Sequence, residues 1–305
     1  MIDNFHIPNN DLKTQVFYTN ESNNSWQTWS KPSNAKFVHI FMLGGGGGGG
    51  GGASTVSATR VGGTGGGGSS ITQSIFPLTL LPDTLYIHVG GGGAGGSPTI
   101  QGSAGSLSYI SVQPNIIATN LILASGGVAA TGGNGAASGN GAGGTIFSNT
   151  QSFLSYTGIY NSVAGQAGGA GSQNAGTNIT VTNLPTTGGA GGGGVALGIA
   201  SSGGSINAFS FSPRISGGIS GSTFISEASD GYHSQLFKNN ITNKDILLFT
   251  GGAGGYGAVS NYGGDGGAGA FGCGGGGGGG GSNTAPFSGG TGGRGGDGLV
   301  IITYW

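Results

Sequence analysis

The chain has 305 residues, of which 77 are glycine, and its formal net charge is −1 with only 6% charged residues. Glycine normally makes up about 7% of a protein, so this composition favours a low-complexity chain. Disordered chains are poor in aromatic residues and rich in net charge, however, whereas this one has 35% hydrophobic residues, 14 Phe and 9 Tyr. This charge balance gives no excess of positive charge that would attract nucleic acid or an anionic membrane. We expect an ordered protein with neutral partners, either glycans or other proteins.

The cysteine content and the N-terminus set further limits. Cys273 is the single cysteine, which excludes an internal disulfide and a cysteine-based zinc site. Residues 1–6 lack a basic n-region and an apolar h-region, and no apolar run reaches the ~18 residues of a transmembrane helix. We expect synthesis in the cytoplasm without a secretion signal, and no membrane insertion. A virus particle released by lysis would be one carrier to the outside.

In chain order, apolar strands alternate with blocks of glycine. A strand is predicted at 14–19, and a second at 36–43 runs directly into nine consecutive glycines at 44–52. Eight more glycines occupy 274–281, and the apolar run 299–305 ends the chain. No apolar spacing typical of a helix is sustained, and glycine is a poor helix former. Between these ends, further strands are predicted at 70–76, 84–89, 107–112, 120–123, 145–147, 177–182, 206–211, 223–225 and 246–250.

Glycine blocks can be ordered because their backbone is bare. In the polyproline-II conformation, N–H and C=O groups point outward in three directions, and without Cβ atoms such helices can pack side by side and bond to one another. At about 3.1 Å per residue the two longest runs span roughly 28 and 25 Å, as a slab of uniform thickness would need. Other residues in these blocks, such as Ala94, Ala170 and Ala190, should face outward or fill small gaps between helices.

The predicted fold class is all-β. We expect antiparallel β-sandwich strands combined with a packed bundle of polyglycine-II helices and essentially no α-helix. Residues 1–13 form an N-terminal segment, and residues 14–305 form a single domain. The strands at 36–43 and 299–305 should pair or lie in adjacent positions.

Three motifs, in which an apolar strand adjoins a glycine-rich block, carry a family resemblance. They are Trp29-x-x-Pro32 before a strand that enters polyglycine, the run from Leu81-Pro82-Asp83 through 84–96, and the terminal 295–304. Over about 14–305 the chain resembles the glycine-rich domain of phage tail-fibre and other virion proteins. Related adhesins at the tips of long tail fibres use a sandwich of polyglycine-II helices, and variable loops at one end bind the host. The longer strand-like excursions of this chain depart from that pattern.

Residues for catalysis or metal binding are sparse. The four histidines, His6, His39, His88 and His233, have no metal-ligand spacing and are interpreted as core or sheet-face residues. Matches to Gly-x-Gly-x-x-Gly are inevitable in such a chain, and no predicted helix follows them, which excludes the dinucleotide-binding interpretation. Cys273 is expected to fill a small gap. We therefore predict no catalytic residues, no metal, no cofactor and no enzymatic activity.

Aromatic residues in polar excursions are the candidate ligand-binding residues. Rings beside Asn and Ser suit carbohydrate or protein surfaces, because they supply rigid amphipathic contact area. The alternative is that these rings cover the ends of the glycine slab and exclude water from it. The candidates are Phe153, Tyr156, Tyr160, Tyr232 and His233, with Phe237 nearby.

The resemblance implies a virion structural protein. We expect a phage tail-fibre, spike or surface component located in the virion, with a host-recognition role. Its partners would be other virion proteins, a host surface glycan or outer-membrane protein, and further copies of itself. The alternatives are a bacterial cell-surface or filament-forming structural protein, and an ice-binding protein, which would need a flat Thr or Ala face on a strict Gly-x-x repeat.

Overall fold

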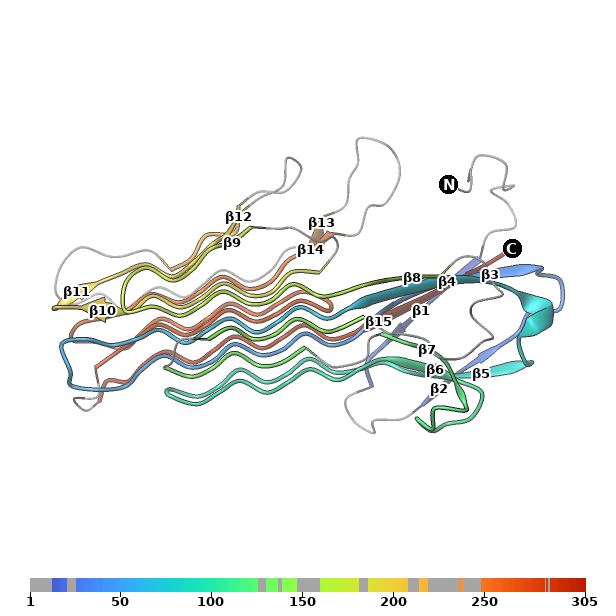
Figure 1. The fold of residues 1–305 in the computed structure, drawn as a ribbon, viewed down its shortest axis with the longest axis horizontal. Coiled ribbons are helices and arrows are strands. Elements are labelled where there is room, and N and C mark those ends of the chain that lie inside the picture. Colours follow the sequence, from blue (N-terminus) through green and yellow to red (C-terminus); the bar gives the residue numbers. More distant parts are fainter. Residues whose placement is uncertain are drawn as a thin grey trace.

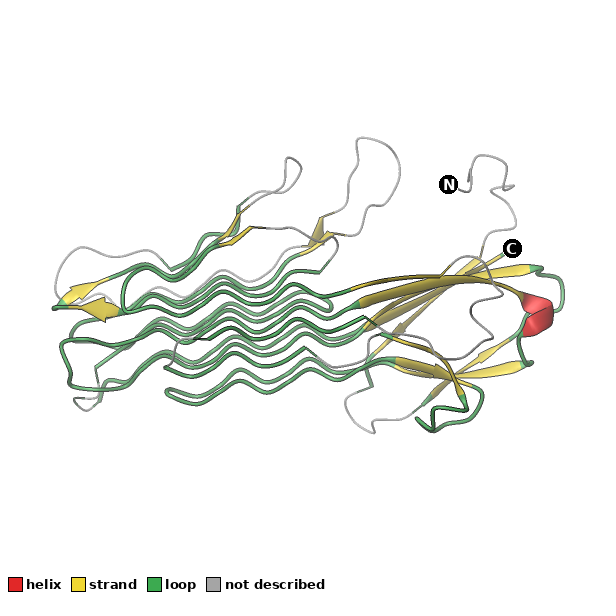
Figure 2. Cartoon of the chain, in the orientation of Figure 1, coloured by secondary structure: helices red, strands yellow, loops and turns green. Residues whose placement is uncertain are grey.

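The computed structural model describes residues 13–20, 26–125, 130–136, 139–146, 160–180, 186–207, 214–218, 236–237, 248–282, 284 and 286–305. The strands of the two larger sheets gather at one end of this elongated molecule (Figure 1). From there, glycine segments run side by side along the long axis (Figure 2). Helical structure in the described residues is limited to one 3-10 turn, Leu78–Leu80, so the all-β prediction is confirmed.

The first sheet joins the two ends of the chain. Its strand order is β1-β15-β3-β4-β8, and all neighbours are antiparallel. Leu299 lies opposite Leu43 and Tyr304 opposite Val38, so the predicted pairing of the two terminal apolar strands is confirmed. The bounds are β1 (Lys13–Tyr18), β3 (Phe37–Leu43), β4 (Ile71–Pro77), β8 (Tyr160–Val163) and β15 (Leu299–Tyr304).

A second antiparallel sheet completes a sandwich. Its order is β2-β5-β6-β7, with β2 (Gln27–Ser30), β5 (Thr84–His88), β6 (Tyr109–Ser111) and β7 (Leu121–Ala124). Alternate residues of a strand point to opposite faces of its sheet, so each strand sends one set of side chains into the space between the sheets. The resulting core contains Val38, Ile40, Met42, Phe76, Val300 and Ile302 from the first sheet, and Trp29, Leu85, Ile87, Ile110 and Leu123 from the second.

The glycine segments form a lattice held by backbone hydrogen bonds. Segment 44–52, which continues β3, is buried throughout. Every N–H group from Gly45 to Gly52 donates to a carbonyl of another segment, at 2.8–2.9 Å. Because the acceptors repeat every third residue, these N–H groups point in three directions: toward segments 100–106, 290–296 and 64–67.

The carbonyl groups of the same segment accept bonds from three further segments. These are 93–99, 133–136 and 275–278, so segment 44–52 has six bonded neighbours. Segment 274–281 is likewise bonded to six segments, among them 252–258 and 187–193. A three-residue period with outward donors and acceptors is the polyglycine-II arrangement. The glycine lattice, called the slab below, therefore replaces side-chain packing with lateral backbone bonding.

Short strands that pair in twos lie beside the slab. They are β9 (Ile179–Thr180), β10 (Val195–Ala196), β11 (Ile199–Ala200), β12 (Ile206–Asn207), β13 (Leu236–Phe237) and β14 (Leu248–Phe249). Ala190 is buried beside Ile179 and Ile206, whereas Ala94 is exposed, and both positions agree with prediction.

The strand predicted at 145–147 is wrong for its described residues, 145–146, which belong to no strand. The glycines just before them bond to the lattice instead, because Gly141 and Gly144 donate to Gly65 and Gly68. The strand predicted at 223–225 lies outside the described residues.

Candidate functional site

The predicted ligand-binding aromatics are described only in part. Tyr160 lies in β8, where its ring packs against the sandwich core, and burial raises the pKa of its hydroxyl. Phe153, Tyr156, Tyr232 and His233 lie outside the described residues, as does the side chain of Phe237, so ligand binding at these residues stays a prediction.

Among the titratable side chains predicted to be structural, Cys273 is buried and His39 and His88 are half-buried, whereas His6 and His233 lie outside the described residues. His39 on β3 and His88 on β5 have pKa values lowered by burial. Burial also raises the pKa of the Cys273 thiol to about 12, which keeps it protonated and unreactive near neutral pH. Cys273 packs with Leu43 and Phe249 in a small core, as a gap-filling residue would. Within the described ranges, no group of His, Cys, Asp or Glu is placed to hold a metal ion.

Three adjacent segments of the slab form an exposed surface, which we call the outer face. Segment 288–298 lies between its neighbours 90–99 and 262–271: Gly292 and Gly295 donate to the first, and Thr291 and Arg294 accept from the second. Only every third residue points outward. The outward positions are Gly91, Ala94 and Ser97 on the first segment, Ser288, Thr291, Arg294 and Asp297 on the second, and Tyr262, Asp265, Ala268 and Phe271 on the third.

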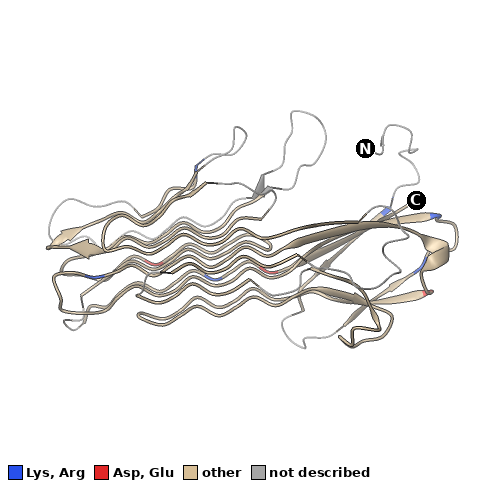
Figure 3. Ribbon diagram, viewed as in Figure 1, with Lys and Arg blue, Asp and Glu red and all other residues tan. Residues whose placement is uncertain are grey.

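A sequence repeat explains this face. Residues 288–298 read Ser-Gly-Gly-Thr-Gly-Gly-Arg-Gly-Gly-Asp-Gly, and residues 262–268 read Tyr-Gly-Gly-Asp-Gly-Gly-Ala. With three residues per turn at about 3.1 Å each, side chains recur roughly every 9 Å on one side, while the glycines turn inward. The outer face was not predicted from the sequence, although the repeat is a visible signal for it. Among the described residues of the slab, other charged side chains are few (Figure 3).

A groove lies where the outer face meets the sandwich. It consists of two hollows of ≈ 780 and ≈ 280 Å³ that share Phe271 and Asp297. The larger hollow lies within the usual volume range of ligand sites, about 300–1,000 Å³. It is lined from β1 and its surroundings by Val16, Tyr18, Thr19, Asn20 and Gln27, and the smaller one by Ala268 and Arg294 among others.

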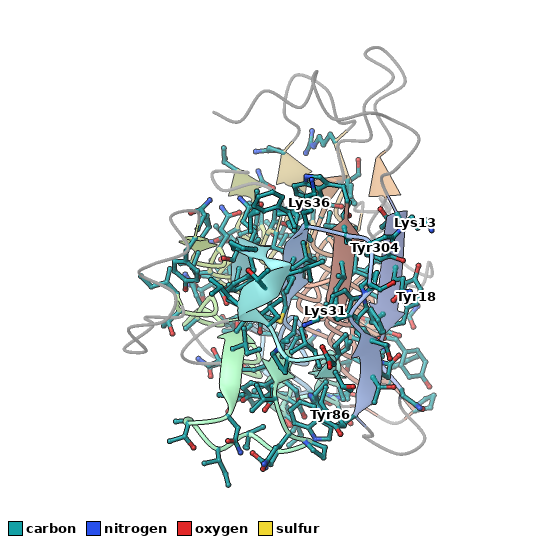
Figure 4. All side chains as sticks on the ribbon, turned by 90° about the vertical axis from the view of Figure 1, so that its right-hand side faces the viewer. Lys13, Tyr18, Lys31, Lys36, Tyr86 and Tyr304 are labelled. Atoms are coloured by element: carbon teal, nitrogen blue, oxygen red, sulfur yellow. The ribbon has the colours of Figure 1, made fainter. Side chains whose placement is uncertain are left out.

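The two rings of the groove are held by their neighbours. The centroids of the Tyr18 and Phe271 rings are 5.9 Å apart, with a tilt of 40°. Phe271 also packs edge-on against buried Phe249, which fixes it to the slab. Tyr18 is 55% exposed and lies on the outer side of β1 (Figure 4). Gln27 donates from Nε2 to the backbone carbonyl of Tyr18 at 2.8 Å and so joins β2 to this wall.

The charged pair of the groove is also fixed. Arg294 donates from Nη2 to Asp297 Oδ1 at 2.7 Å and from Nη1 to Oδ2 at 3.2 Å. The N–H of Gly92 donates to the same Oδ1 at 2.8 Å. Asp297 thereby bonds a lattice N–H that points to the outer face. The pair adds polar groups to the groove without adding net charge.

The opposite end of the slab carries exposed apolar side chains on three loops, which we call the tip. Val56 is 69% exposed, and Leu197 and Ile199, on the hairpin β10–β11, are 87% and 71% exposed. Buried Arg60 holds the loops together: its backbone bonds to Val195, and its Nη1 donates to the carbonyl of Ala258 at 2.7 Å. The hairpin lies at the end farthest from the sandwich (Figure 1).

The described residues thus define an all-β protein in which a β-sandwich continues into a slab of polyglycine-II segments. Its sequence matches the profile of a family described as a glycine-rich domain, over residues 20–305. Since the match covers nearly the whole chain, the protein belongs to this glycine-rich domain family. No curated protein matches the chain. No helix in the described ranges is long and apolar enough to cross a membrane.

Proposed function

We propose that the protein is a non-enzymatic structural component of a virion, a phage tail-fibre, spike or surface protein with a host-recognition role. Its partners would be other virion proteins at the sandwich end and a host surface glycan or outer-membrane protein at the tip. The observation that carries the proposal is the slab of laterally hydrogen-bonded segments that separates these two ends.

The slab is suited to act as a spacer between the sandwich and the tip, because its order does not depend on side chains. Segment 44–52 is bonded to six others, so a local bend would break bonds in several segments at once. Such a lattice can hold loops at a fixed place while their sequence varies, since loops tolerate substitution better than the elements they connect. A recognition surface that must adapt to different hosts benefits from this separation of support and contact.

The tip has the composition of a contact surface. Exposed apolar side chains scattered singly need no explanation, but Leu197 and Ile199 are close together on one hairpin, whose neighbouring loop carries Val56. Binding of a partner would remove these side chains from water. A structural protein that only fills space would gain nothing from exposing them.

Two measurements test the proposal. Mass spectrometry of purified virus particles should detect the chain, and its absence from particles would refute a virion role. Particles carrying Leu197→Asp and Ile199→Asp should adsorb to host cells more slowly than unaltered particles. Ile116→Asp with Ile117→Asp is the matched control, because these side chains are 61% and 59% exposed on the β6–β7 loop, far from the tip, and only particles that contain equal amounts of the chain are compared. Equal adsorption by all three would refute recognition at the tip.

A further inference from the structure

The groove at the sandwich end of the outer face has the features of a ligand site distinct from the tip. We propose that it binds a neutral oligosaccharide, with one sugar on the rings of Tyr18 and Phe271 and the next ones along the row toward Arg294. Because the groove and the tip lie at opposite ends of the slab, this inference does not depend on the proposed role in host recognition.

The rings set the class of ligand. Tyr18 and Phe271 together present a tilted apolar surface that Phe249 supports from behind, and Tyr18 adds a hydroxyl at its margin. Aromatic side chains of this kind supply rigid amphipathic contact area, apolar at the ring face and polar at the edge. A pyranose ring has the complementary surface, since its C–H groups form one apolar face and its hydroxyls project from the rim.

The charges of the groove favour a neutral saccharide over an acidic or a basic one. Among the described residues, the groove is lined by one cation, Arg294, and one anion, Asp297, and these are paired with each other. An acidic saccharide would have to break this pair to gain a free guanidinium, and a basic one would compete with the guanidinium for the carboxylate. Thr19, Asn20 and Gln27 add uncharged hydroxyl and amide groups to the larger hollow, and these suit neutral hydroxyls.

The geometry favours a linear ligand that lies along the row. The larger hollow adjoins the smaller one at Phe271 and Asp297, which line both. Ala268 keeps the second hollow open, because a larger side chain at this outward position would fill the space between Phe271 and Arg294. The lattice fixes the wall on this side, so little ordering of the protein would be needed on binding.

Isothermal titration calorimetry of the full chain with neutral cello-, malto- and chito-oligosaccharides tests the proposal. At least one series should bind, and Tyr18→Ala should weaken its binding roughly five- to tenfold through loss of one ring. Ala268→Leu should weaken binding by blocking the second hollow, and it leaves the aromatic pair in place. Circular dichroism identifies a variant that has lost its fold.

Phe37→Ala is the matched control, since Phe37 is also exposed and stacks on Trp305 elsewhere on the sandwich. Its saccharide binding should equal that of the unaltered protein. Failure of all three saccharide series to bind, or binding unchanged by both Tyr18→Ala and Ala268→Leu, would overturn the assignment. The tip substitutions Leu197→Asp and Ile199→Asp should not change saccharide binding, so the two proposals can fail separately.

Discussion

The sandwich and the slab reach order by opposite means. In the sandwich, Leu85, Ile87 and Ile40 are inaccessible to solvent, and burial of such side chains provides the main stabilisation. In the slab, residues 44–52 have no side chains to bury, and backbone bonds in several directions hold the segments. Each such bond contributes only about 0.5–1.5 kcal/mol, so the slab depends on many bonds formed together.

The difference shows how a glycine-rich chain can fold at all. Glycine loses more conformational freedom on folding than any other residue, and a lone glycine segment could not offset that cost. Here β3 runs directly into segment 44–52, and β15 begins directly after segment 288–298. The sandwich thereby sets the starting positions of the lattice. We expect the two regions to unfold together.

The largest expected effect comes from one methyl group in the slab. In Gly49→Ala the new Cβ would overlap the carbonyl oxygen and carbon of Gly276, which are lattice backbone and cannot rotate away. The free energy of unfolding should fall by more than about 4 kcal/mol, a range that requires a severe steric or packing defect. Chemical denaturation followed by circular dichroism measures it.

Gly91→Ala is the control for this prediction. Its Cβ would point to the outer face, with Asp297 Oδ1 and Thr19 Oγ1 at 4.0 Å as its nearest neighbours. We expect a change of less than about 0.5 kcal/mol, as for ordinary surface substitutions. If Gly49→Ala were equally mild, the slab would be looser than its hydrogen bonds indicate.

A large-to-small substitution should affect the sandwich less severely. Leu85→Ala leaves a cavity between the sheets and should cost about 2–5 kcal/mol. Because the sandwich sets the starting positions of the lattice, the loss should appear as a shift of one common transition. Hydrogen exchange of the amides of 44–52 measures this coupling. Unchanged protection there would show that the slab is stable independently of the sandwich.

A smaller effect should follow from the two half-buried histidines, His39 and His88. Burial lowers the pKa of His39 and His88 below the ordinary 6.5, so both bind protons more weakly in the folded than in the unfolded protein. Their contribution to stability is therefore complete above about pH 6.5 and declines as the pH falls through the lowered values. Thermal unfolding between neutral and acidic pH should show the decline. His39→Gln with His88→Gln should reduce its slope, and an identical slope would contradict this assignment.

The sequence predicted the fold where its pattern was simple. The apolar runs near the longest glycine blocks predicted the pairing of β3 with β15. The absence of Cβ atoms in these blocks predicted backbone hydrogen bonds between neighbouring glycine segments. β8 was not predicted, because Tyr-Asn-Ser-Val has no apolar alternation. Its pairing with β4 is accompanied by a contact between the hydroxyls of Thr72 and Ser162 at 3.2 Å, which a single-strand pattern cannot indicate.

The site could be predicted only in part. The repeat that places Thr291, Arg294 and Asp297 on one side is written in the sequence, but which segments lie beside it depends on the lattice. Tyr18 and Phe271 are distant in the chain and meet only because β1 pairs with β15, which leads out of the slab. The candidate aromatic residues of the sequence analysis were chosen from their polar surroundings alone, because the sequence does not indicate which ring would lie beside another.

The smallest effect should come from a side chain of the slab. Asp297→Ala removes the acceptor of the Gly92 N–H and the partner of Arg294, whose side chain is 48% exposed. Water at the groove can replace both contacts, and exposed ion pairs contribute about 0–1 kcal/mol, so we expect a loss near 1 kcal/mol or less. Asp297→Asn, which keeps an oxygen acceptor, should lose still less in the same denaturation experiment. A loss for Asp297→Ala comparable to that for Gly49→Ala would mean that side chains, and not the backbone lattice, hold the slab.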